Sequence, residues 1–230
     1  MPPARPAGLV PPPDKPAAGS PPAAPSPVQA GPSTPAPTEA TCLAKLAAIP
    51  GNRISSAVAE AAQTDPACRV EEPVRVAALA LRGADGSIAV AFEPPPLLAC
   101  AMAASLADWL DRSVQPLARG YFGKDLMNLR VGGGQECRRR NRASAGPVSE
   151  HATGKALDIF AFTLKQDGAP NPVSVEKPAG LVQSRFLEAV RQSACGAFMT
   201  VLGPGSDAAH ANHLHVDIQQ RRSQASRFCQ

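Results

Sequence analysis

The sequence has few aromatic residues and no dense positive charge. It contains one tryptophan and one tyrosine, and its 23 basic residues are nearly balanced by 19 acidic ones, giving a net charge of +4. Nucleic-acid-binding proteins usually present a denser basic face together with aromatic side chains on which bases stack. The composition therefore excludes nucleic acid as an expected partner, and the pair Arg221–Arg222 is interpreted as solvated surface.

Several motifs are also absent. No run of about 18 consecutive apolar residues occurs, so no segment is predicted to span a membrane, and the N-terminus lacks the apolar region of a signal peptide. No Gly-x-Ser-x-Gly elbow surrounds Ser149, which argues against a serine hydrolase. The three glycines at 132–134 are not followed by Lys-Ser or Lys-Thr, so they do not predict a phosphate loop.

Proline is abundant but unevenly distributed. Of 26 prolines, 14 lie in residues 1–40, together with nine alanines and only four charged residues. Such a stretch cannot bury enough apolar surface to offset the entropy of ordering it. Residues 1–40 are therefore predicted to form a disordered or polyproline-like arm that serves as a tether, with a reach of roughly 120 Å when extended. Residues 41–230 are predicted to form one folded domain.

The hydrophobic periodicity of residues 41–230 predicts an α+β domain, a mostly antiparallel sheet flanked by helices. Trp109 falls on the apolar face of the longest helical pattern and is expected in the core. Asp85-Gly86 predicts the turn of a hairpin. Helices are expected at 41–49, 97–118 and 181–195. Strands are expected at 74–81, 87–92, 126–131, 155–164, 172–175, 198–202 and 213–218.

Six cysteines are scattered over the domain without a C-x-x-C pair. An even, scattered set predicts three disulfides and an oxidising compartment rather than a zinc ribbon; the alternative is six buried thiols in a cytosolic protein. We therefore expect a periplasmic or cell-envelope protein whose export signal or membrane anchor preceded Met1. A disulfide between Cys195 and Cys229 would fix the C-terminal tail near the strand that carries His215. Closure between nearest neighbours predicts the pairs Cys42–Cys68, Cys100–Cys137 and Cys195–Cys229.

The four histidines fall in two short segments. The first segment contains His151 and, seven residues later, Asp158, a carboxylate that interrupts an apolar row of a predicted strand. A buried carboxylate requires a partner, and a metal ion is a suitable one. The second segment contains His210, His213 and His215. Side chains two residues apart on a strand share a face, so His213, His215 and Asp217 are expected to align.

Two histidines and one aspartate are typical ligands of a catalytic zinc ion, because three protein ligands leave the fourth position open. A further histidine nearby could act as a general base or stabilise developing charge. Asp217 could orient a ligand histidine from outside the ligand set, or could simply end the strand, and Ser149 could likewise support a ligand.

The two segments resemble a known superfamily. The first resembles the first zinc motif of D-alanyl-D-alanine carboxypeptidases and LAS-type peptidases, and the second is similar to that of murein endopeptidases. More closely, residues 41–230 resemble the bacterial extensin-like C-terminal domain family. The matching stretches are Ser149-x-His151-x-x-Gly154-x-Ala156-x-Asp158, His210-x-x-His213-x-His215, Cys137-Arg138, and Val201-Leu202-Gly203-Pro204 followed by His213-Leu214-His215-Val216-Asp217.

The resemblance implies a zinc-dependent peptidase that acts on peptidoglycan stem peptides. We expect the protein to be a monomer. It implies one zinc ion held by His151, Asp158 and His215. It also implies His213 as the catalytic histidine and His210 as a residue that stabilises the transition state.

Two further positions are read from the same resemblance. Arg138 occupies the place of a residue that holds a substrate carboxylate in the carboxypeptidases, and a planar guanidinium suits that role. A basic surface position is the alternative for Arg138. Some relatives carry a glutamate where this chain has Asn212, which favours the endopeptidase type of site. A second class of function remains open, a non-catalytic module that uses the same fold to bind the cell wall.

Overall fold

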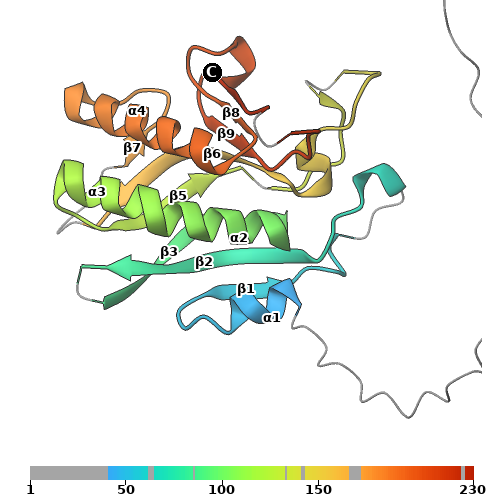
Figure 1. The fold of residues 1–230 in the computed structure, drawn as a ribbon, viewed down its shortest axis with the longest axis horizontal. Helices are drawn as coiled ribbons and strands as arrows, with labels where there is room; N and C mark the ends of the chain where they lie inside the picture. Colours follow the sequence, from blue (N-terminus) through green and yellow to red (C-terminus); the bar gives the residue numbers. More distant parts are fainter. Residues whose placement is uncertain are drawn as a thin grey trace, which may run out of the picture. The chain divides into compact units, whose positions relative to one another are not determined.

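The structure is a computed structural model that describes residues 41–61, 65–84, 86–132, 134–140, 143–165, 172–223 and 226–230. The predicted arm at 1–40 lies outside the described residues, as does Asp85 of the predicted hairpin turn. The described part is the mixed α+β domain that the periodicity predicts, with one ten-stranded sheet and helices packed against it (Figure 1).

Eight strands follow one another across the sheet in the order β1-β2-β3-β5-β6-β9-β8-β10, while β4 pairs with β2 and β7 pairs with β6. The pairs β3–β5 and β8–β10 are parallel and the other pairs are antiparallel. The strands are β1 Arg53–Ser56, β2 Pro73–Gly83, β3 Gly86–Glu93, β4 Leu97–Ala99, β5 Leu126–Val131, β6 Ala156–Leu164, β7 Val173–Ser174, β8 Thr200–Leu202, β9 Leu214–Asp217 and β10 Phe228–Cys229.

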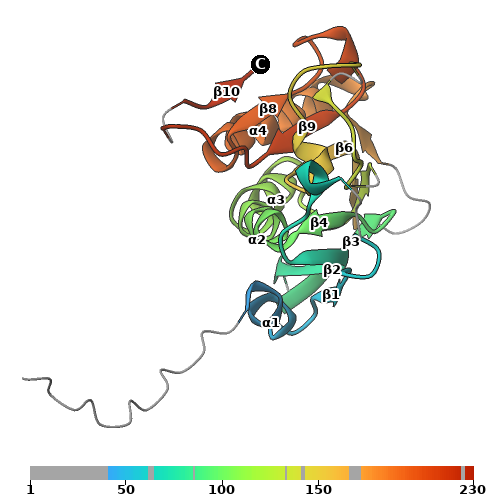
Figure 2. The same cartoon turned by 90° about the vertical axis from the view of Figure 1, so that its right-hand side faces the viewer.

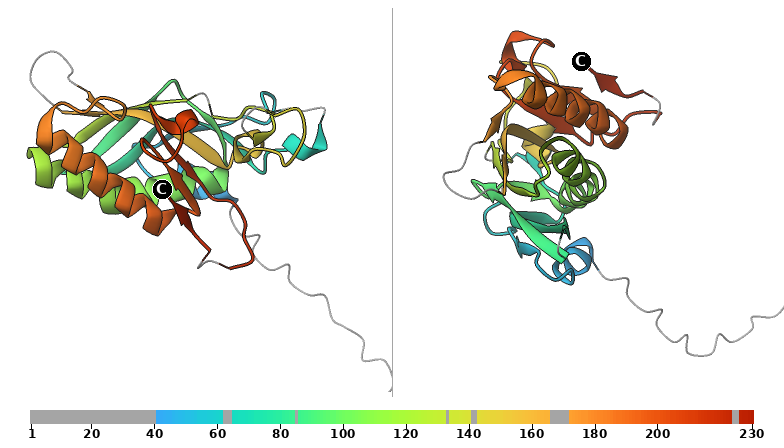
Figure 3. Two further views of the ribbon diagram at one scale, coloured as in Figure 1. Left: turned by 90° about the horizontal axis from the view of Figure 1, so that it is seen from above. Right: turned by 90° about the vertical axis from the view of Figure 1, so that its left-hand side faces the viewer.

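The long helices α2, α3 and α4 lie on one face of the sheet, whereas α1 packs beside the edge strand β1 (Figure 3). Among the described residues, three single-turn 3₁₀ helices, labelled η1, η4 and η5, lie in the connections. The helices are α1 Cys42–Ala47, α2 Cys100–Trp109, α3 Gln115–Phe122, α4 Gly180–Ala197, η1 Pro66–Cys68, η4 Glu150–Thr153 and η5 Ala208–His210.

The predicted hairpin and the predicted first helix are confirmed. Strands β2 and β3 pair antiparallel from Ala78 opposite Ala91 to Gly83 opposite Gly86. Gly86 has a φ of 122°, a conformation that a residue with a side chain rarely adopts. The hydroxyl of Thr41 accepts a hydrogen bond from the backbone N–H of Ala44 and caps α1, as its position predicts.

The helix predicted over 97–118 begins later than expected. Residues Leu97–Ala99 form the short strand β4, which pairs antiparallel with β2, and α2 begins at Cys100. The helix then continues to Phe122 through a π-helical turn at Leu110–Val114. Pro116 follows this turn, and a proline cannot donate a backbone hydrogen bond and clashes with the carbonyl four residues earlier. The wider π turn accommodates it.

Large apolar side chains from the helices and the sheet form the main core, and a smaller apolar cluster lies around Val70 and Leu97. Trp109 is buried in the main core, as predicted; its ring lies edge-on to that of Phe198, with centroids 5.3 Å apart, and its indole N–H donates to the hydroxyl of Ser193. Two edge strands, β1 and β10, were not predicted. Both are short and mostly exposed, so neither carries the alternation that marks a half-buried strand.

The six cysteines form three disulfides, but two of the three predicted pairs are wrong. The pairs are Cys42–Cys100, Cys68–Cys137 and Cys195–Cys229, and only the last was predicted. Nearest-neighbour closure fails because α1 packs against α2 and η1 packs against η4, so each of the first four cysteines meets a partner distant in sequence. Three disulfides indicate an oxidising compartment. Within the described residues, no helix is long and apolar enough to cross a membrane.

Candidate metal centre

Two adjacent strands place an aspartate beside a histidine. In the antiparallel pair β6–β9, Asp158 lies directly opposite His215. Directly opposed residues project from the same face of a sheet with their Cβ atoms close together. The carboxyl oxygen Oδ1 of Asp158 accordingly lies 2.8 Å from Nδ1 of His215.

His151 reaches the same point from η4, which precedes β6. The hydroxyl of Ser149 caps this turn by accepting a hydrogen bond from the backbone N–H of His151 at 3.4 Å. Gly154 ends the turn with a φ of 67°, and a Cβ there would lie 2.7 Å from the backbone nitrogen of Ala99. Only glycine fits this close approach, which lets the chain turn directly from His151 into β6.

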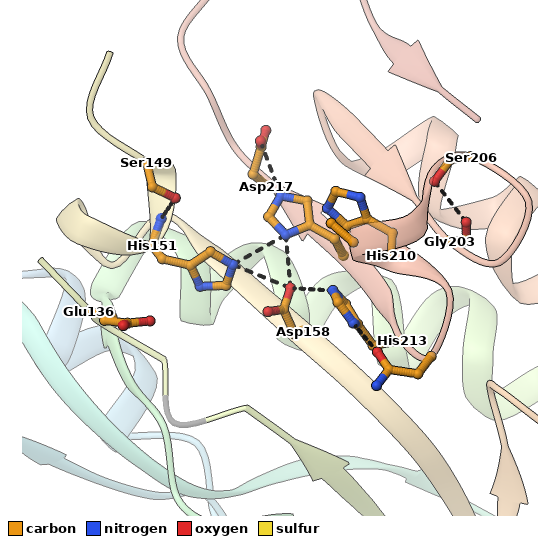
Figure 4. Close-up of polar contacts among 12 residues, drawn as sticks. Glu136, Ser149, His151, Asp158, Gly203, Ser206, His210, His213 and Asp217 are labelled. Atoms are coloured by element: carbon orange, nitrogen blue, oxygen red, sulfur yellow. Dashed lines mark hydrogen bonds and ion pairs between the residues drawn. The ribbon is translucent and has the colours of Figure 1, made fainter. Parts of the chain in front are cut away.

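Three potential ligand atoms converge between these elements (Figure 4). Nε2 of His151 lies 3.2 Å from Oδ1 of Asp158 and 3.2 Å from Nδ1 of His215. The three atoms lie within 4.8 Å of one another, and both histidines are buried. This group could hold a metal ion, because two imidazole nitrogens and a carboxylate oxygen form a donor set that zinc accepts.

The outward nitrogens of both histidines have oxygen partners. Nδ1 of His151 lies 3.4 Å from the carbonyl oxygen of Gly134, and Nε2 of His215 lies 3.5 Å from Oδ2 of Asp217. When these nitrogens carry the protons, the lone pairs of the opposite nitrogens face each other and Asp158. Outer partners of this kind orient the ligands of most metal-binding histidines. Asp217 therefore lies where the sequence suggested, beside a ligand candidate.

The charges around the three atoms favour a cation. Burial alone would raise the pKa of Asp158, but its hydrogen bonds with His151 and His215 outweigh burial and hold the pKa well below the usual range. Burial alone would lower the pKa of His215, but the carboxylates of Asp158 and Asp217 raise it to about 9. A proton bound this tightly occupies a position of strongly negative potential, which a metal ion could occupy instead.

The other two histidines line the same site (Figure 4). Nε2 of His213 lies 3.5 Å from Oδ1 of Asp158, and its Nδ1 lies 2.8 Å from the side-chain oxygen of Asn212. Burial, with the neighbouring histidines, lowers the pKa of His213 despite the opposing effect of Asp158. Nδ1 of His210 lies 2.7 Å from Oδ1 of Asp207, and a hydrogen bond between them lowers the pKa of Asp207.

The four histidines and Asp158 line a cavity of about 500 Å³. Arg138, the predicted carboxylate-binding residue, lines the cavity, and its Nε donates to Glu136 at 2.9 Å. Arg140 also lines it and lies 3.3 Å from Glu150. Burial and Asp217 raise the pKa of Glu150, against the opposing effects of Arg140 and Lys155.

Three lining residues, Gln219, Arg221 and Phe228, come from the C-terminal tail, the segment that follows β9, and were not predicted. Arg221 is half-buried in the cavity wall instead of lying on solvated surface, and Phe228 lines the cavity with it. The only sequence signal was the expected Cys195–Cys229 bridge, which predicted a tail fixed near the His215 strand. Strand β10 indeed pairs with β8, which pairs with β9 (Figure 2).

The fold and the site together define a class of protein. It is an α+β domain, stabilised by three disulfides, whose candidate metal centre combines an aspartate and a histidine from two adjacent antiparallel strands with a histidine from the preceding turn η4. The model of the family described as extensin-like protein C-terminus matches residues 40–230. The chain therefore belongs to this family. No curated protein and no solved structure matches the chain.

Proposed function

We propose that this domain is a zinc-dependent peptidase that cleaves peptidoglycan stem peptides or their cross-links, as an endopeptidase rather than a carboxypeptidase. One observation carries the proposal. The ligand candidates His151, Asp158 and His215 converge in one cavity with two further histidines, His210 and His213. A purely structural metal site would need only its ligands.

The donor set fits zinc better than the hard cations. Two imidazole nitrogens and one carboxylate suit zinc, whereas calcium and magnesium prefer oxygen ligands alone. Three protein ligands leave a coordination position for water or substrate. When bound there, zinc would supply an activated water molecule near neutral pH and would polarise the carbonyl group of the peptide.

His213 is suited to move the proton in this reaction. With a proton on Nδ1 donated to Asn212, its Nε2 carries a lone pair on the side of Asp158. The lowered pKa keeps His213 neutral at pH 7, so Nε2 can accept a proton from the attacking water. The same atom can then deliver that proton to the departing amine nitrogen.

The remaining cavity residues would bind and orient the peptide. Asp207 holds the ring of His210 through Nδ1, so a proton on Nε2 would let His210 donate to the oxygen on which negative charge develops. Arg138 offers a guanidinium at the cavity wall for a substrate carboxylate. Some LAS-type peptidases carry a glutamate at the position of Asn212. An asparagine cannot act as the base, which supports the endopeptidase type of site.

Metal analysis together with digestion of purified sacculi tests the proposal. We expect the purified chain to bind one zinc ion and to release muropeptides only without chelator. His151→Ala should lose the zinc, whereas His213→Ala should keep it and lose activity by at least about 100-fold, the usual contribution of a general base. Sedimentation with sacculi provides the control. Binding without released peptides would support the non-catalytic wall-binding module, and an active His213→Ala enzyme would refute the assigned base.

A further inference from the structure

The C-terminal tail is fixed against the cavity by its backbone and by a disulfide. Strand β10 runs parallel to β8, with the N–H of Phe228 donating to the carbonyl of Met199 at 2.9 Å and the N–H of Gln230 donating to that of Val201 at 3.0 Å. Cys229, next to Phe228, is bonded to Cys195 of α4. The tail is therefore held to both a strand and a helix of the core.

Arg221 braces the same tail. Its Nη1 donates to the carbonyl of Ser226 at 2.6 Å, its Nη2 donates to the hydroxyl of Thr200 at 2.9 Å, and its Nε donates to the side chain of Gln219 at 3.2 Å. All three guanidinium nitrogens are thus bonded within the chain. Arg221 consequently links the tail to β8. Because its guanidinium is engaged in these hydrogen bonds, we assign Arg221 a structural role and not a substrate-binding one.

Phe228 is the residue of strand β10 whose side chain lines the cavity. All seven phenylalanines lie in the described residues, and Phe228 alone is exposed, at 43%. It lines the cavity that contains the four histidines. A backbone pairing and a disulfide would hold the tail equally well with a polar residue here. The ring offers a large apolar area at the cavity wall, and covering such an area with an apolar group of a ligand is favourable.

We propose that Phe228 is a specificity-determining residue that contacts the aliphatic part of a peptide substrate. This inference rests on the proposed function, because it places the substrate in the same cavity. The cavity has guanidinium groups on the segment that precedes His151, at Arg138 and Arg140, and an aromatic ring on the tail. It is therefore complementary to a peptide that presents a carboxylate and, separately, an aliphatic side chain such as that of alanine.

Kinetics and binding of the zinc-loaded full chain test this role. For a soluble stem peptide containing alanine, Phe228→Ala should raise both KM and Kd about tenfold, since the ligand would no longer cover the ring. The value of kcat and the zinc content should stay unchanged, and Phe228→Leu should recover most of the affinity. Leu181→Ala, at an apolar side chain that is 72% exposed on α4 outside the cavity, is the matched control and should bind as the wild type does.

Specificity provides a second readout. The wild type should prefer the alanine-containing peptide over the same peptide with glycine, and Phe228→Ala should bring this ratio close to one. The double variant Cys195→Ala/Cys229→Ala, which releases the tail, should weaken binding in the same direction. Adding Phe228→Ala to this double variant should then lower the affinity only slightly further, because both changes remove the same contact between the ring and the peptide.

Equal affinity of the wild type and Phe228→Ala for the alanine peptide would overturn the role of Phe228, whatever the turnover. A wild type that binds the peptide without cleaving it would refute the peptidase proposal, while the loss of affinity in Phe228→Ala would still support the contact. A wild type that does not bind the peptide would overturn both. Failure of the two proposals is therefore distinguishable.

Discussion

At the scale of single residues, Asp217 illustrates how one carboxylate serves two partners. One oxygen accepts the backbone N–H of Gln219 at 3.0 Å, and the other lies 3.5 Å from Nε2 of His215. Both partners are donors when Nδ1 of His215 is left free for a metal. Only a group that accepts with both of its oxygens satisfies the pair, which explains why an acid lies at this buried position.

Replacing Asp217 by asparagine should therefore weaken metal binding without removing a ligand. An amide can accept from only one of the two donors, so either His215 or Gln219 loses its partner, and the negative charge beside His215 is lost as well. We expect Asp217→Asn to weaken zinc affinity about tenfold or more, measured by competition with a chromophoric chelator.

The matched control is Asp108→Asn, which removes a carboxylate whose side chain is 61% exposed on α2 and paired with Arg112. It should leave zinc affinity unchanged. Equal affinities of the wild type and Asp217→Asn would mean that Asp217 ends the strand without tuning His215.

The candidate ligands could be predicted at this scale, but the rest of the cavity wall could not. Side chains alternate along a strand, so the spacing of His213 and His215 already implied a shared face, and Asp158 was conspicuous in an apolar row. Arg221 and Phe228 carry no such local signal. Their place in the cavity depends on the return of the tail beside β8, a contact between distant parts of the chain.

At the scale of elements, a buried polar network joins α3 to the start of β5. Oδ1 of Asp125 accepts from Nε2 of Gln115 and from Nε of Arg119, each at 2.7 Å, and Oδ2 accepts the N–H of Ala84 at 3.1 Å. The side-chain oxygen of Gln115 accepts the N–H of Leu126 at 2.8 Å. The network thus fixes α3 and the hairpin β2–β3 to the start of β5.

Asp125→Asn should destabilise the domain by about 2 kcal/mol at neutral pH, because an amide leaves one of three donors without an acceptor in a buried site. Urea unfolding of the two proteins measures the difference. Glu188→Gln is the control, since that carboxylate is 68% exposed and paired with Arg185 on the same helix, α4. A loss as small as that of the control would show that the network is dispensable.

The contribution of Asp125 should also depend on pH. Burial alone would raise its pKa, but hydrogen bonds from Arg119 and Ala84 lower it below the ordinary value of 3.8. The folded state thus binds this proton less tightly than the unfolded state does. The stabilisation is fully present above the unfolded pKa and is lost as the pH falls through the lower folded pKa. The difference between the wild type and Asp125→Asn should therefore shrink as the pH falls below about 4.

Elements with a strong local pattern were predicted, and elements defined by distant partners were not. The hairpin β2–β3 and the helix α4 each carry the period of their own structure. Strand β4 carries none, because Leu97–Ala99 is three buried residues long and its apolar run merges with the helix that follows. It is a strand only because β2 offers it a pairing edge.

At the scale of the whole molecule, two of the disulfides differ in whether they support the candidate metal centre. Cys42–Cys100 joins α1 to the start of α2. Cys68–Cys137 joins η1 to the segment that supports His151. In that segment the carbonyl of Gly134 faces Nδ1 of His151, and the N–H of Glu136 donates to the carbonyl of His151 at 3.3 Å.

The two bridges have similar sequence separations, 58 and 69 residues. In the chain-entropy account each should therefore contribute about 4 kcal/mol to stability. Removing either bridge by paired Cys→Ala substitution should lower the denaturation midpoint by a comparable amount. Their effects on metal binding should differ.

Cys68→Ala/Cys137→Ala frees the segment that orients His151, so zinc affinity measured well below the unfolding transition should fall about tenfold, as it does when the outer partner of a ligand is lost. Cys42→Ala/Cys100→Ala should leave the affinity unchanged, because β4 pairing with β2 still holds the start of α2. Because the two variants are matched in stability loss, a general loosening of the fold would weaken zinc binding equally in both. Equal affinities would therefore contradict a specific coupling of the Cys68–Cys137 bridge to the metal centre.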